Sequence, residues 1–481
     1  MDTKKLRQKI LDLAIHGKLV PQDPNDEPAS VLLERIRAEK ERLIKEGKIK
    51  RSKKSASDTP HYENEVLFEV PESWECCHVS DIFELNPKNN VPDDTQSGFI
   101  PMACVDDGFG YAHSFETRPW GEIRKGYSHF QNGDIGIAKI SPCFENRKST
   151  IFYDLPNGIG AGTTELTVLR GHCVNIEFYL YLFQSEWYIF EGTKEFKGVV
   201  GQQRVNKEIF TTLLIPLPPI EEQNRIVTEI KKWFSLIDTL ETAKEDLQES
   251  IAQAKSKILD LAIHGRLVPQ DLNDEPAIEL LRRINPKFTP CDNAHYANVP
   301  SNWTTILLGD LCFTINGLWK GKKPPFVNVG VIRNANFTKD CKLDYTNIAY
   351  LDVEVKQYEK RKLQCGDIIV EKSGGSDNQP VGRTILFERK DGDYSFSNFT
   401  SVLRIYDGYP AIPEFLNMFL QSIYQTGITK RMQTQTTGIH NLIFDKFLAI
   451  PILLPPITEQ SRIINKVNEL FPLLDNISAD L

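Results

Sequence analysis

Two regions of this chain, residues 60–215 and 286–452, carry polar loops whose residue types could contact a nucleic acid. Arginine and lysine suit guanine edges, asparagine and glutamine suit adenine edges, and serine and threonine suit phosphates or either base. The candidates in the first region are Lys139, Ser141, Asn146, Arg147, Lys148, Thr164, Gln202, Gln203, Arg204 and Asn206. The candidates in the second region are Lys320, Lys322, Lys323, Lys372, Ser373, Ser376, Asn378, Gln379, Asn398, Lys430, Arg431, Gln433, Gln435, Thr436, His440 and Asn441.

Polar loops are often only solvated, so their position in the chain matters. The loop GQQRVN at 201–206 and the loop QTQTTGIHN at 433–441 both precede an Ile-Pro pair that ends the region. This equivalence favours a shared role for the two loops.

The sequence contains only weak matches to the motifs of known catalytic sites. Lys323-Pro324-Pro325-Phe326 has the form of the turn that binds an amine in amino-methyltransferases, but lysine stands at the amine-binding position and no F-x-G-x-G loop accompanies it. Asp344 with Glu354-Val355-Lys356 matches a nuclease pattern that arises often by chance. Ser373–Ser376 is glycine-rich without the lysine of a phosphate-binding loop, and a tight turn is an equal explanation. We therefore predict no catalytic residue, no metal site and no cofactor in this chain.

The two regions share landmarks but little other sequence. Each has a V-P-x-x-W phrase, then Gly-Asp-Ile, then V-L-R, then Ile-Pro, at similar spacings. Strand-like runs such as DIIVEKS alternate with helix-like runs such as IPEFLNMFLQSIY, which predicts one α+β fold carrying two different surfaces. The paired landmarks are Trp74 and Trp303, Gly133 and Gly366, Arg170 and Arg404, and Pro216 and Pro451.

A long helix is predicted between the two regions, from about 220 to 263. At ~1.5 Å per residue it would span ~65 Å. Its apolar residues recur in steps of three and four with one polar slot, Lys244, which is typical of a helix packed along one seam against another helix. The apolar positions are Ile226, Ile230, Trp233, Ile237, Leu240, Leu247, Ile251, Ala254, Ile258 and Leu261.

Both halves of this central stretch are repeated at the ends of the chain. Residues 9–36 match residues 257–284 at 23 of 28 positions, and LPPITEQSRII at 454–464 mirrors LPPIEEQNRIV at 217–227. The ends would together recreate the central helix, which predicts antiparallel helices and a pseudo-twofold axis. The first repeat ends at His16-Gly17 and the second at His264-Gly265, where we expect glycine to cap the helix.

Composition limits the class of protein. The formal net charge is −8, yet residues 60–215 carry −10, residues 285–452 carry +3 and residues 1–59 carry +5, with a basic linker at 48–58. The nine cysteines include no C-x-x-C pair, and the N-terminus is a charged amphipathic segment. A reduced, cytoplasmic protein without a membrane span is expected.

The chain resembles the specificity subunit of type I restriction-modification enzymes. The resemblance is carried by L-P-P-I-x-E-Q, I-L-D-L-A-I-H-G-[KR]-L-V-P-Q, GDIIVEKSGGS and FSNFTSVLR, and it covers essentially the whole chain. It implies two target recognition domains that each read half of a bipartite double-stranded DNA site, and no catalysis in this subunit. It also implies two modification subunits that use S-adenosylmethionine to methylate adenine, and restriction subunits that use ATP and Mg²⁺.

This resemblance and the patterns above predict a particular division of the chain. The long helices would fix the length of the unread spacer between half-sites and offer their outer faces to the partner subunits. The alternatives are a coiled-coil scaffold that binds no nucleic acid and a stand-alone DNA methyltransferase or nuclease. The predicted parts are a helical segment and linker at 1–59, recognition domains at 60–215 and 286–452, the central helix and repeat at 216–285, and a C-terminal helix at 453–481.

Overall fold

The structure is a computed structural model that describes residues 2–49, 68–194, 203–292, 296, 299–318, 321–338, 341–376, 379–436 and 438–479. Most of the basic linker predicted at 48–58 lies outside the described residues, as do Gln202, Lys320 and Asn378. The chain forms two compact units, Met1–Ala243 and Lys244–Leu481. No helix in the described ranges combines the length and the apolar character needed to cross a membrane.

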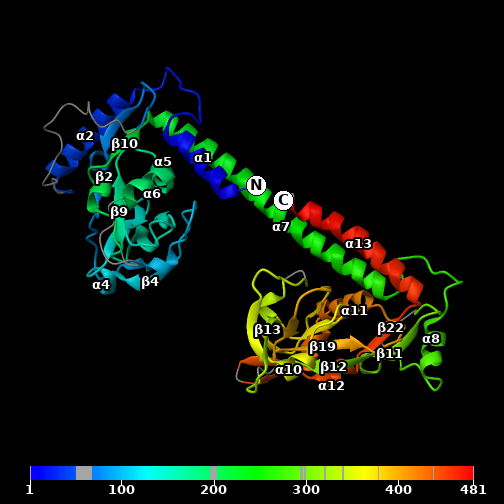
Figure 1. The fold of residues 1–481 in the computed structure, drawn as a ribbon. Helices are drawn as coiled ribbons and strands as arrows, with labels where there is room; N and C mark the ends of the chain where they lie inside the picture. The colour runs from blue at the N-terminus through cyan, green and yellow to red at the C-terminus, as the bar shows by residue number, and fades with distance from the viewer. Residues whose placement is uncertain are drawn as a thin grey trace. The chain divides into compact units, whose positions relative to one another are not determined.

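The first unit contains an α+β domain whose first and last strands, β1 (Glu75–His78) and β10 (Leu214–Leu217), pair antiparallel (Figure 1). Two four-stranded sheets have the orders β2–β9–β6–β7 and β4–β3–β8–β5. Their strands are β2 Phe83–Leu85, β3 Gln96–Ile100, β4 Glu116–Pro119, β5 Ser128–Gln131, β6 Ile135–Ala138, β7 Ser149–Ile151, β8 Ile159–Gly162 and β9 Leu166–Gly171. The helices before and within this domain are α1 Thr3–Ile15, α2 Ala29–Lys45, α3 Val79–Ile82, α4 Trp120–Ile123, α5 Ile176–Gln184 and α6 Glu186–Thr193.

The second unit repeats this plan. Strands β11 (Thr304–Leu307) and β22 (Pro451–Leu454) pair antiparallel, and the sheets have the orders β12–β19–β15–β17, β14–β13–β18 and β16–β21–β20. Their strands are β12 Cys312–Asn316, β13 Phe326–Ile332, β14 Ala349–Glu354, β15 Ile368–Glu371, β16 Ser373–Gly375, β17 Thr384–Leu386, β18 Tyr394–Phe396, β19 Thr400–Ile405, β20 Gln433–Thr436 and β21 Ile439–Leu442. The helices are α8 Ala277–Ile284, α9 Leu308–Leu311, α10 Val355–Glu359, α11 Pro413–Gln425, α12 Phe444–Leu448 and α13 Ile457–Ala479.

The two domains therefore share one frame, as the paired landmarks predict. The order β2–β9–β6–β7 corresponds to β12–β19–β15–β17, and β4–β3–β8 corresponds to β14–β13–β18. The Gly-Asp-Ile runs lead into β6 and β15, whose side chains are buried throughout, and the V-L-R runs lie in their neighbours β9 and β19. A strand buried on both faces reads as a continuous apolar run, which explains why these short runs are recognisable in both copies.

A buried ion pair joins the Gly-Asp-Ile and V-L-R landmarks in each domain. Arg170 donates from Nε and Nη2 to the two carboxylate oxygens of Asp134, at 2.9 and 2.8 Å. Arg404 binds Asp367 in the same way, at 2.6 and 2.7 Å. Both aspartates are almost completely buried, so each needs the bidentate partner that arginine provides. The sequence landmarks are thus two halves of one structural contact.

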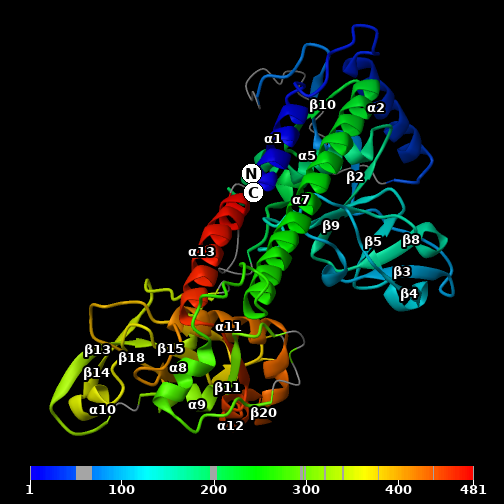
Figure 2. The same ribbon diagram turned by 90° about the vertical axis from the view of Figure 1, so that its right-hand side faces the viewer.

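The long helix α7 runs from Ile220 to Ile263, as predicted, and belongs to both units. In the first unit α1 lies beside α7 (Figures 1 and 2) and is antiparallel to it, because Arg7 of α1 binds Asp238 and Glu241, whereas Gln22 beyond α1 binds Glu222. In the second unit α13 lies beside α7, and an ion pair joins Lys255 of α7 to Asp475 of α13.

The predicted apolar seam of α7 is only partly buried. Ile226, Ile230, Ile237 and Ile251 are buried, whereas Trp233, Leu240 and Leu247 are 41%, 50% and 40% exposed. Val227 and Phe234, outside the predicted seam, are buried instead. Phe234 packs on Tyr181 and under Arg7, so the buried face of α7 in the first unit is shared between α1 and the α+β domain. The prediction that α7 packs along one seam against a single helix is therefore wrong for this part of α7, because the α+β domain covers part of the buried face.

Two local features of the helices follow from single residues. Gly17 and Gly265 follow the ends of α1 and α7 with φ of +65° and +66°, as expected of helix-capping glycines. The largely apolar run IEFYLYLFQSEWYIF, residues 176–190, is divided into α5 and α6 at Ser185. The Ser185 hydroxyl accepts from the N–H of Tyr188, which starts the second helix and explains the break.

Candidate nucleic-acid interface

In the first domain, the segment after β6 pairs with the segment that contains Gln203 and Arg204. Ile140 and Arg204 form an antiparallel bridge, and the Ser141 N–H donates to the Gln203 carbonyl over 2.9 Å. The pairing continues at Lys139, whose backbone carbonyl accepts from the N–H of Val205 at 2.9 Å. We call Lys139, Ser141, Gln203 and Arg204 the Arg204 cluster. These four predicted contact residues lie together although they are distant in the chain.

An acidic residue, Glu165, adjoins the Arg204 cluster. Its carboxylate accepts from Arg204 Nε and Nη2, at 3.0 and 2.6 Å, and this hydrogen bonding lowers the pKa of Glu165. The predicted residue Thr164 is exposed beside Glu165, and Asn206 precedes the 3-10 helix Lys207–Phe210. The ion pair occupies the Nε and Nη2 edge of Arg204, so a bidentate contact with a base through that edge would require Arg204 to leave Glu165.

Asn146, Arg147 and Lys148 are not part of the Arg204 cluster but lie on the adjoining turn between Ser141 and β7. Asn146 is exposed, whereas Arg147 donates from Nε to the Gln184 carbonyl at 3.0 Å and its guanidinium lies 5.3 Å from the ring centre of Phe109. Lys148 pairs with Asp107 at 3.4 Å. Burial lowers the pKa of Arg147, whose side chain lines a cavity together with residues of α1. These contacts give Arg147 and Lys148 roles inside the unit.

In the second domain, the sheet β16–β21–β20 gathers the predicted loops. Ser373 pairs with Asn441, and the Ser373 hydroxyl donates to the Asn441 side-chain oxygen at 2.6 Å. His440 is opposite Gln435 in β20 and opposite Gly375 in β16. We call this the β21 sheet. It corresponds to the pairing of Ile140 with Arg204 in the first domain, because both follow the Gly-Asp-Ile strand.

The remaining predicted residues of the second domain fall around or away from the β21 sheet. Lys372 immediately precedes β16, Ser376 and Gln379 close a turn after it through two backbone hydrogen bonds, and Gln433 and Thr436 are the ends of β20. Lys430 and Arg431 lie in the 3-10 helix Ile428–Met432 that leads into β20. Lys322 and Lys323 lie instead before β13, where their N–H groups each donate to Glu354 at 3.3 Å.

A surface cavity of about 510 Å³ adjoins the β21 sheet and includes residues that the sequence analysis omitted. Asn334 lines the cavity and donates from Nδ2 to the Ser373 carbonyl at 2.6 Å, while Phe399 lines it and accepts from the N–H groups of Lys372 and Ser373. The predicted residue Asn398 also lines it and is exposed. The polar run Arg333–Asn336 directly after a strand was the sequence signal that could have identified Asn334.

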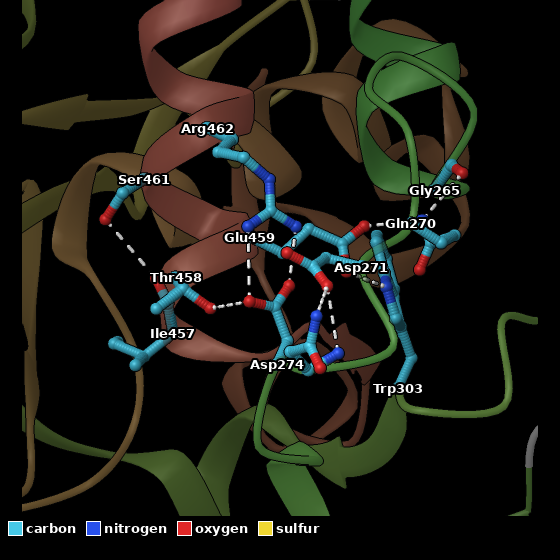
Figure 3. Close-up of polar contacts among 11 residues, drawn as sticks. Gly265, Gln270, Asp271, Asp274, Trp303, Ile457, Thr458, Glu459, Ser461 and Arg462 are labelled. Carbon is cyan, nitrogen blue, oxygen red and sulfur yellow. Dashed lines mark hydrogen bonds and ion pairs between the residues drawn. The ribbon is translucent and has the colours of Figure 1, made fainter.

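The L-P-P-I-x-E-Q phrase forms a buried polar junction at the start of a long helix. Figure 3 shows the copy in the second unit, where the Glu459 carboxylate accepts from Gln270 Nε2 at 2.6 Å and from Trp303 Nε1 at 3.0 Å. Arg462, one turn along α13, binds Asp274 at 2.5 and 3.2 Å. We call this the Glu459 junction. It joins three segments: the repeat loop after α7, the start of the recognition domain and the first turn of α13.

The first unit contains the same junction, which we call the Glu222 junction. Glu222 accepts from Gln22 Nε2 at 2.6 Å and from Trp74 Nε1 at 2.9 Å. Arg225 binds Asp26 at 2.6 and 3.0 Å. Glu222 and Glu459 are both 0% exposed, and burial raises the pKa of each carboxyl above its ordinary value.

The glutamine of each phrase binds the recognition domain itself. Gln223 accepts from the N–H of Asn175, which caps α5, at 2.8 Å. Gln460 accepts from the N–H of Ile412, which caps α11, at 2.8 Å and donates to the Pro410 carbonyl. Adjacent residues of one helical turn therefore bind both the repeat loop and the recognition domain.

A duplicated α+β domain, joined to paired helices by identical polar junctions, defines a class of two-domain proteins with a helical connector. The family model for the "Type I restriction modification DNA specificity domain" matches residues 71–249 and 300–478. The chain belongs to this family of type I restriction enzyme specificity subunits, and catalysis in those enzymes lies in other subunits.

Individual relatives agree with this assignment. The chain is 34% identical to the EcoAI specificity subunit of Escherichia coli, with 97% of this chain and 88% of the relative covered. It is 33% identical to the EcoEI specificity subunit of Escherichia coli, with coverage of 99% and 90%. A solved structure described as "Structural basis underlying complex assembly and conformational transition of the type I R-M system" has the same fold, with a TM-score of 0.57, 18% identity and coverage of 86% and 94%.

Proposed function

We propose that this chain is the DNA-recognition subunit of a type I restriction-modification complex, in which each recognition domain reads one half of a bipartite double-stranded DNA site. The Arg204 cluster would contact one half-site and the β21 sheet the other. Arginine and glutamine side chains would contact base edges, and the lysines would contact phosphates. The particular target sequence is set by the docking geometry of these side chains.

One observation carries the proposal. Two domains of the same fold pair the same segments after the Gly-Asp-Ile strand, yet the side chains on those segments differ. The first domain has Lys139, Gln203 and Arg204, whereas the second has Ser373, Gln435 and His440. A common frame with different polar side chains suits two different half-sites better than it suits two copies of one protein-binding surface.

The proposed partners follow from the family and from the helices. Two modification subunits would supply S-adenosylmethionine and methylate adenine, and restriction subunits would supply ATP- and Mg²⁺-dependent cleavage. The exposed Trp233, Leu240 and Leu247 of α7 offer apolar area to a helical partner. The assembled complex would act in the cytoplasm, on chromosomal and incoming DNA. The length of α7 would set the unread spacer between the half-sites.

The test is a map of adenine methylation in cells that carry this chain with its modification partner, compared with cells that lack this chain. A bipartite motif with a fixed spacer that disappears with the chain would support the proposal. Absence of any difference, together with no binding of the purified complex to random duplex DNA, would favour a protein scaffold. Methylation or cleavage by the purified chain alone would favour a stand-alone enzyme.

A matched pair of variants tests the first half-site. Arg204→Ala removes a predicted base contact, whereas Arg124→Ala removes an exposed arginine of the same domain that pairs with Asp93. Loss of a good bidentate base contact costs about 1–3 kcal/mol, so Arg204→Ala should weaken binding by roughly 5-fold to 150-fold. Equal affinities of the two variants for the mapped site would contradict a reading role for Arg204.

A further inference from the structure

The Glu222 and Glu459 junctions are the same in the two units although the domains that they hold share little sequence. In each, a carboxylate in the first turn of a long helix accepts one hydrogen bond from a repeat loop and one from the tryptophan at the start of a recognition domain. The matching donor–acceptor distances differ by at most 0.1 Å between the units, being 2.6 and 2.9 Å in one and 2.6 and 3.0 Å in the other.

Each junction fixes the orientation of its domain about the helix as well as the position of that domain. Glu459 and Gln460 are adjacent in α13 and therefore point to different sides of the helix. Glu459 binds Trp303 and the repeat loop, whereas Gln460 binds the N-terminal cap of α11 in the same domain. Two contacts on different sides of one helical turn oppose rotation of the domain about the helix. Gln223 with Asn175 completes the same arrangement in the first unit.

The residues that would contact bases are separate from these junctions. Ser373, Asn441 and His440 lie in the β21 sheet, where the Ser373 hydroxyl donates to Asn441, and the Glu459 junction contains none of them. A change at Glu459 can therefore alter the angle of the domain without altering the side chains that would contact bases.

We propose that Glu222 and Glu459 are positioning residues that hold each recognition domain at one angle to its helix and so determine how strictly the complex rejects DNA with a wrong spacer length. This inference rests on the proposed function, because spacer length has meaning only for a bipartite DNA site. Hydrogen bonds to a charged acceptor are about twice as strong as neutral ones, so a buried carboxylate suits this role.

The substitution Glu459→Gln keeps the shape of the side chain and weakens the junction. The carboxylate offers two acceptor oxygens to two donors, whereas the glutamine amide offers one oxygen and turns an N–H₂ group toward the second donor. The combined variant Glu459→Gln, Gln270→Glu exchanges donor and acceptor and restores the hydrogen bond between these two side chains, while it removes the bond that Gln270 Nε2 donates to the Gly265 carbonyl at 3.2 Å. Glu222→Gln, with Gln22→Glu as its restoring partner, repeats the experiment in the other unit.

The experiment uses the full-length chain assembled with its modification subunits and DNA duplexes that carry the mapped half-sites. The spacer is varied by one base pair in each direction, and the rate of adenine methylation is measured on each duplex. We expect Glu459→Gln to raise the ratio of the rate on altered spacers to the rate on the natural spacer at least tenfold. The restoring variant should return this ratio to that of the wild type.

Two controls separate positioning from stability. Glu469→Gln removes the same charge from an exposed residue of α13 that pairs with Lys466, and it should leave the ratio unchanged. Single-base changes within the half-sites should be rejected equally by wild type and Glu459→Gln. If methylation falls equally on all spacers in both Glu459→Gln and Glu222→Gln, the junctions are only structural and the inference is overturned. If the wild type methylates no bipartite site, the proposed function itself fails.

Discussion

At the scale of single residues, the buried ions of each recognition domain are compensated by arginine. Asp134, Asp367 and Glu371 are nearly inaccessible, and each accepts two hydrogen bonds from one guanidinium, that of Arg170, Arg404 or Arg383. An unpaired buried carboxylate is costly, so removal of the arginine is more damaging than the net value of the pair suggests.

Arg170→Ala should therefore destabilise the first domain strongly. Breaking a buried pair by removing one partner costs about 3–5 kcal/mol, because Asp134 remains buried without its partner. The free energy of unfolding from urea denaturation, followed by tryptophan fluorescence, measures this change. Arg124→Ala removes an exposed arginine of the same domain and should cost less than about 1 kcal/mol. Similar losses for the two variants would contradict a structural role for the Arg170–Asp134 pair.

The Glu459 carboxyl should make stability depend on pH. Burial raises the pKa of Glu459 in the folded chain above its ordinary value of 4.5. The folded state binds this proton more tightly than the unfolded state, so the favourable contribution is fully present below about 4.5 and is lost as pH rises through the folded pKa. The free energy of unfolding of the wild type relative to Glu459→Gln should fall over this window and stay constant above it. Urea denaturation from pH 4 to pH 8 measures the difference, and a constant difference throughout would refute the assignment.

At the scale of elements, the ends of the helices determine where the recognition domains attach. Gly17 and Gly265 have the left-handed backbone conformation that glycine adopts readily, and both lie close to the proline and tryptophan of a V-P-x-x-W phrase. A Cβ at Gly265 would lie 2.6 Å from Pro300 Cγ and 3.1 Å from the Trp303 ring. Glycine is needed here for its conformation and also for its small size.

Comparison of two glycine substitutions separates these effects. Gly408 also has positive φ, +82°, but a Cβ there would meet no atom within 4 Å. Gly408→Ala should cost about 1–2 kcal/mol, the price of the left-handed conformation alone. Gly265→Ala should cost more, because Pro300 or Trp303 must also move. Thermal unfolding of both variants measures the difference, and equal melting temperatures would show that the close approach to Pro300 has no energetic weight.

At the scale of the whole molecule, α7 is, among the helices and strands that the structure describes, the element that continues from one compact unit into the other. Each unit has its own hydrophobic core, its own recognition domain and its own polar junction. Under the proposed function, a change in the length of α7 therefore changes the relation of the two half-sites and leaves each reading surface intact.

Insertion of four residues, about one helical turn, near Lys244 should lengthen the spacer of the methylated site. One turn adds about 6 Å at ~1.5 Å per residue, which corresponds to roughly two base pairs at ~3.4 Å each. Both half-sites should remain unchanged in a map of adenine methylation. A substitution of Lys244 by alanine without insertion serves as the control. An unchanged spacer in the insertion variant would contradict the role of helix length.

The sequence predicted the frame of the molecule well. The apolar periodicity predicted the bounds of α7, and the landmark phrases predicted that the two domains are equivalent. Both predictions succeeded because buried strands and helix-capping glycines leave local patterns in the sequence. The seam was less predictable, since Phe234 is buried against the recognition domain and periodicity does not reveal which partner a helix face meets. Local sequence could not reveal that the predicted contact residue Arg147 turns toward Gln184, or that Asn334, which was not predicted, lies beside Ser373, because both contacts depend on distant segments.

The paired strands β1–β10 and β11–β22 have a consequence for how this protein can change over generations. Each recognition domain begins and ends at one antiparallel pair, so its two ends are fixed side by side whatever the length or sequence of the chain between them. Changes in the intervening chain leave the attachment unaltered, provided that the paired strands, the junction and the helix cap bound by Gln223 or Gln460 survive. The attachment is thus separate from the chain that can diverge, and under the proposed function new specificities could arise without a new assembly.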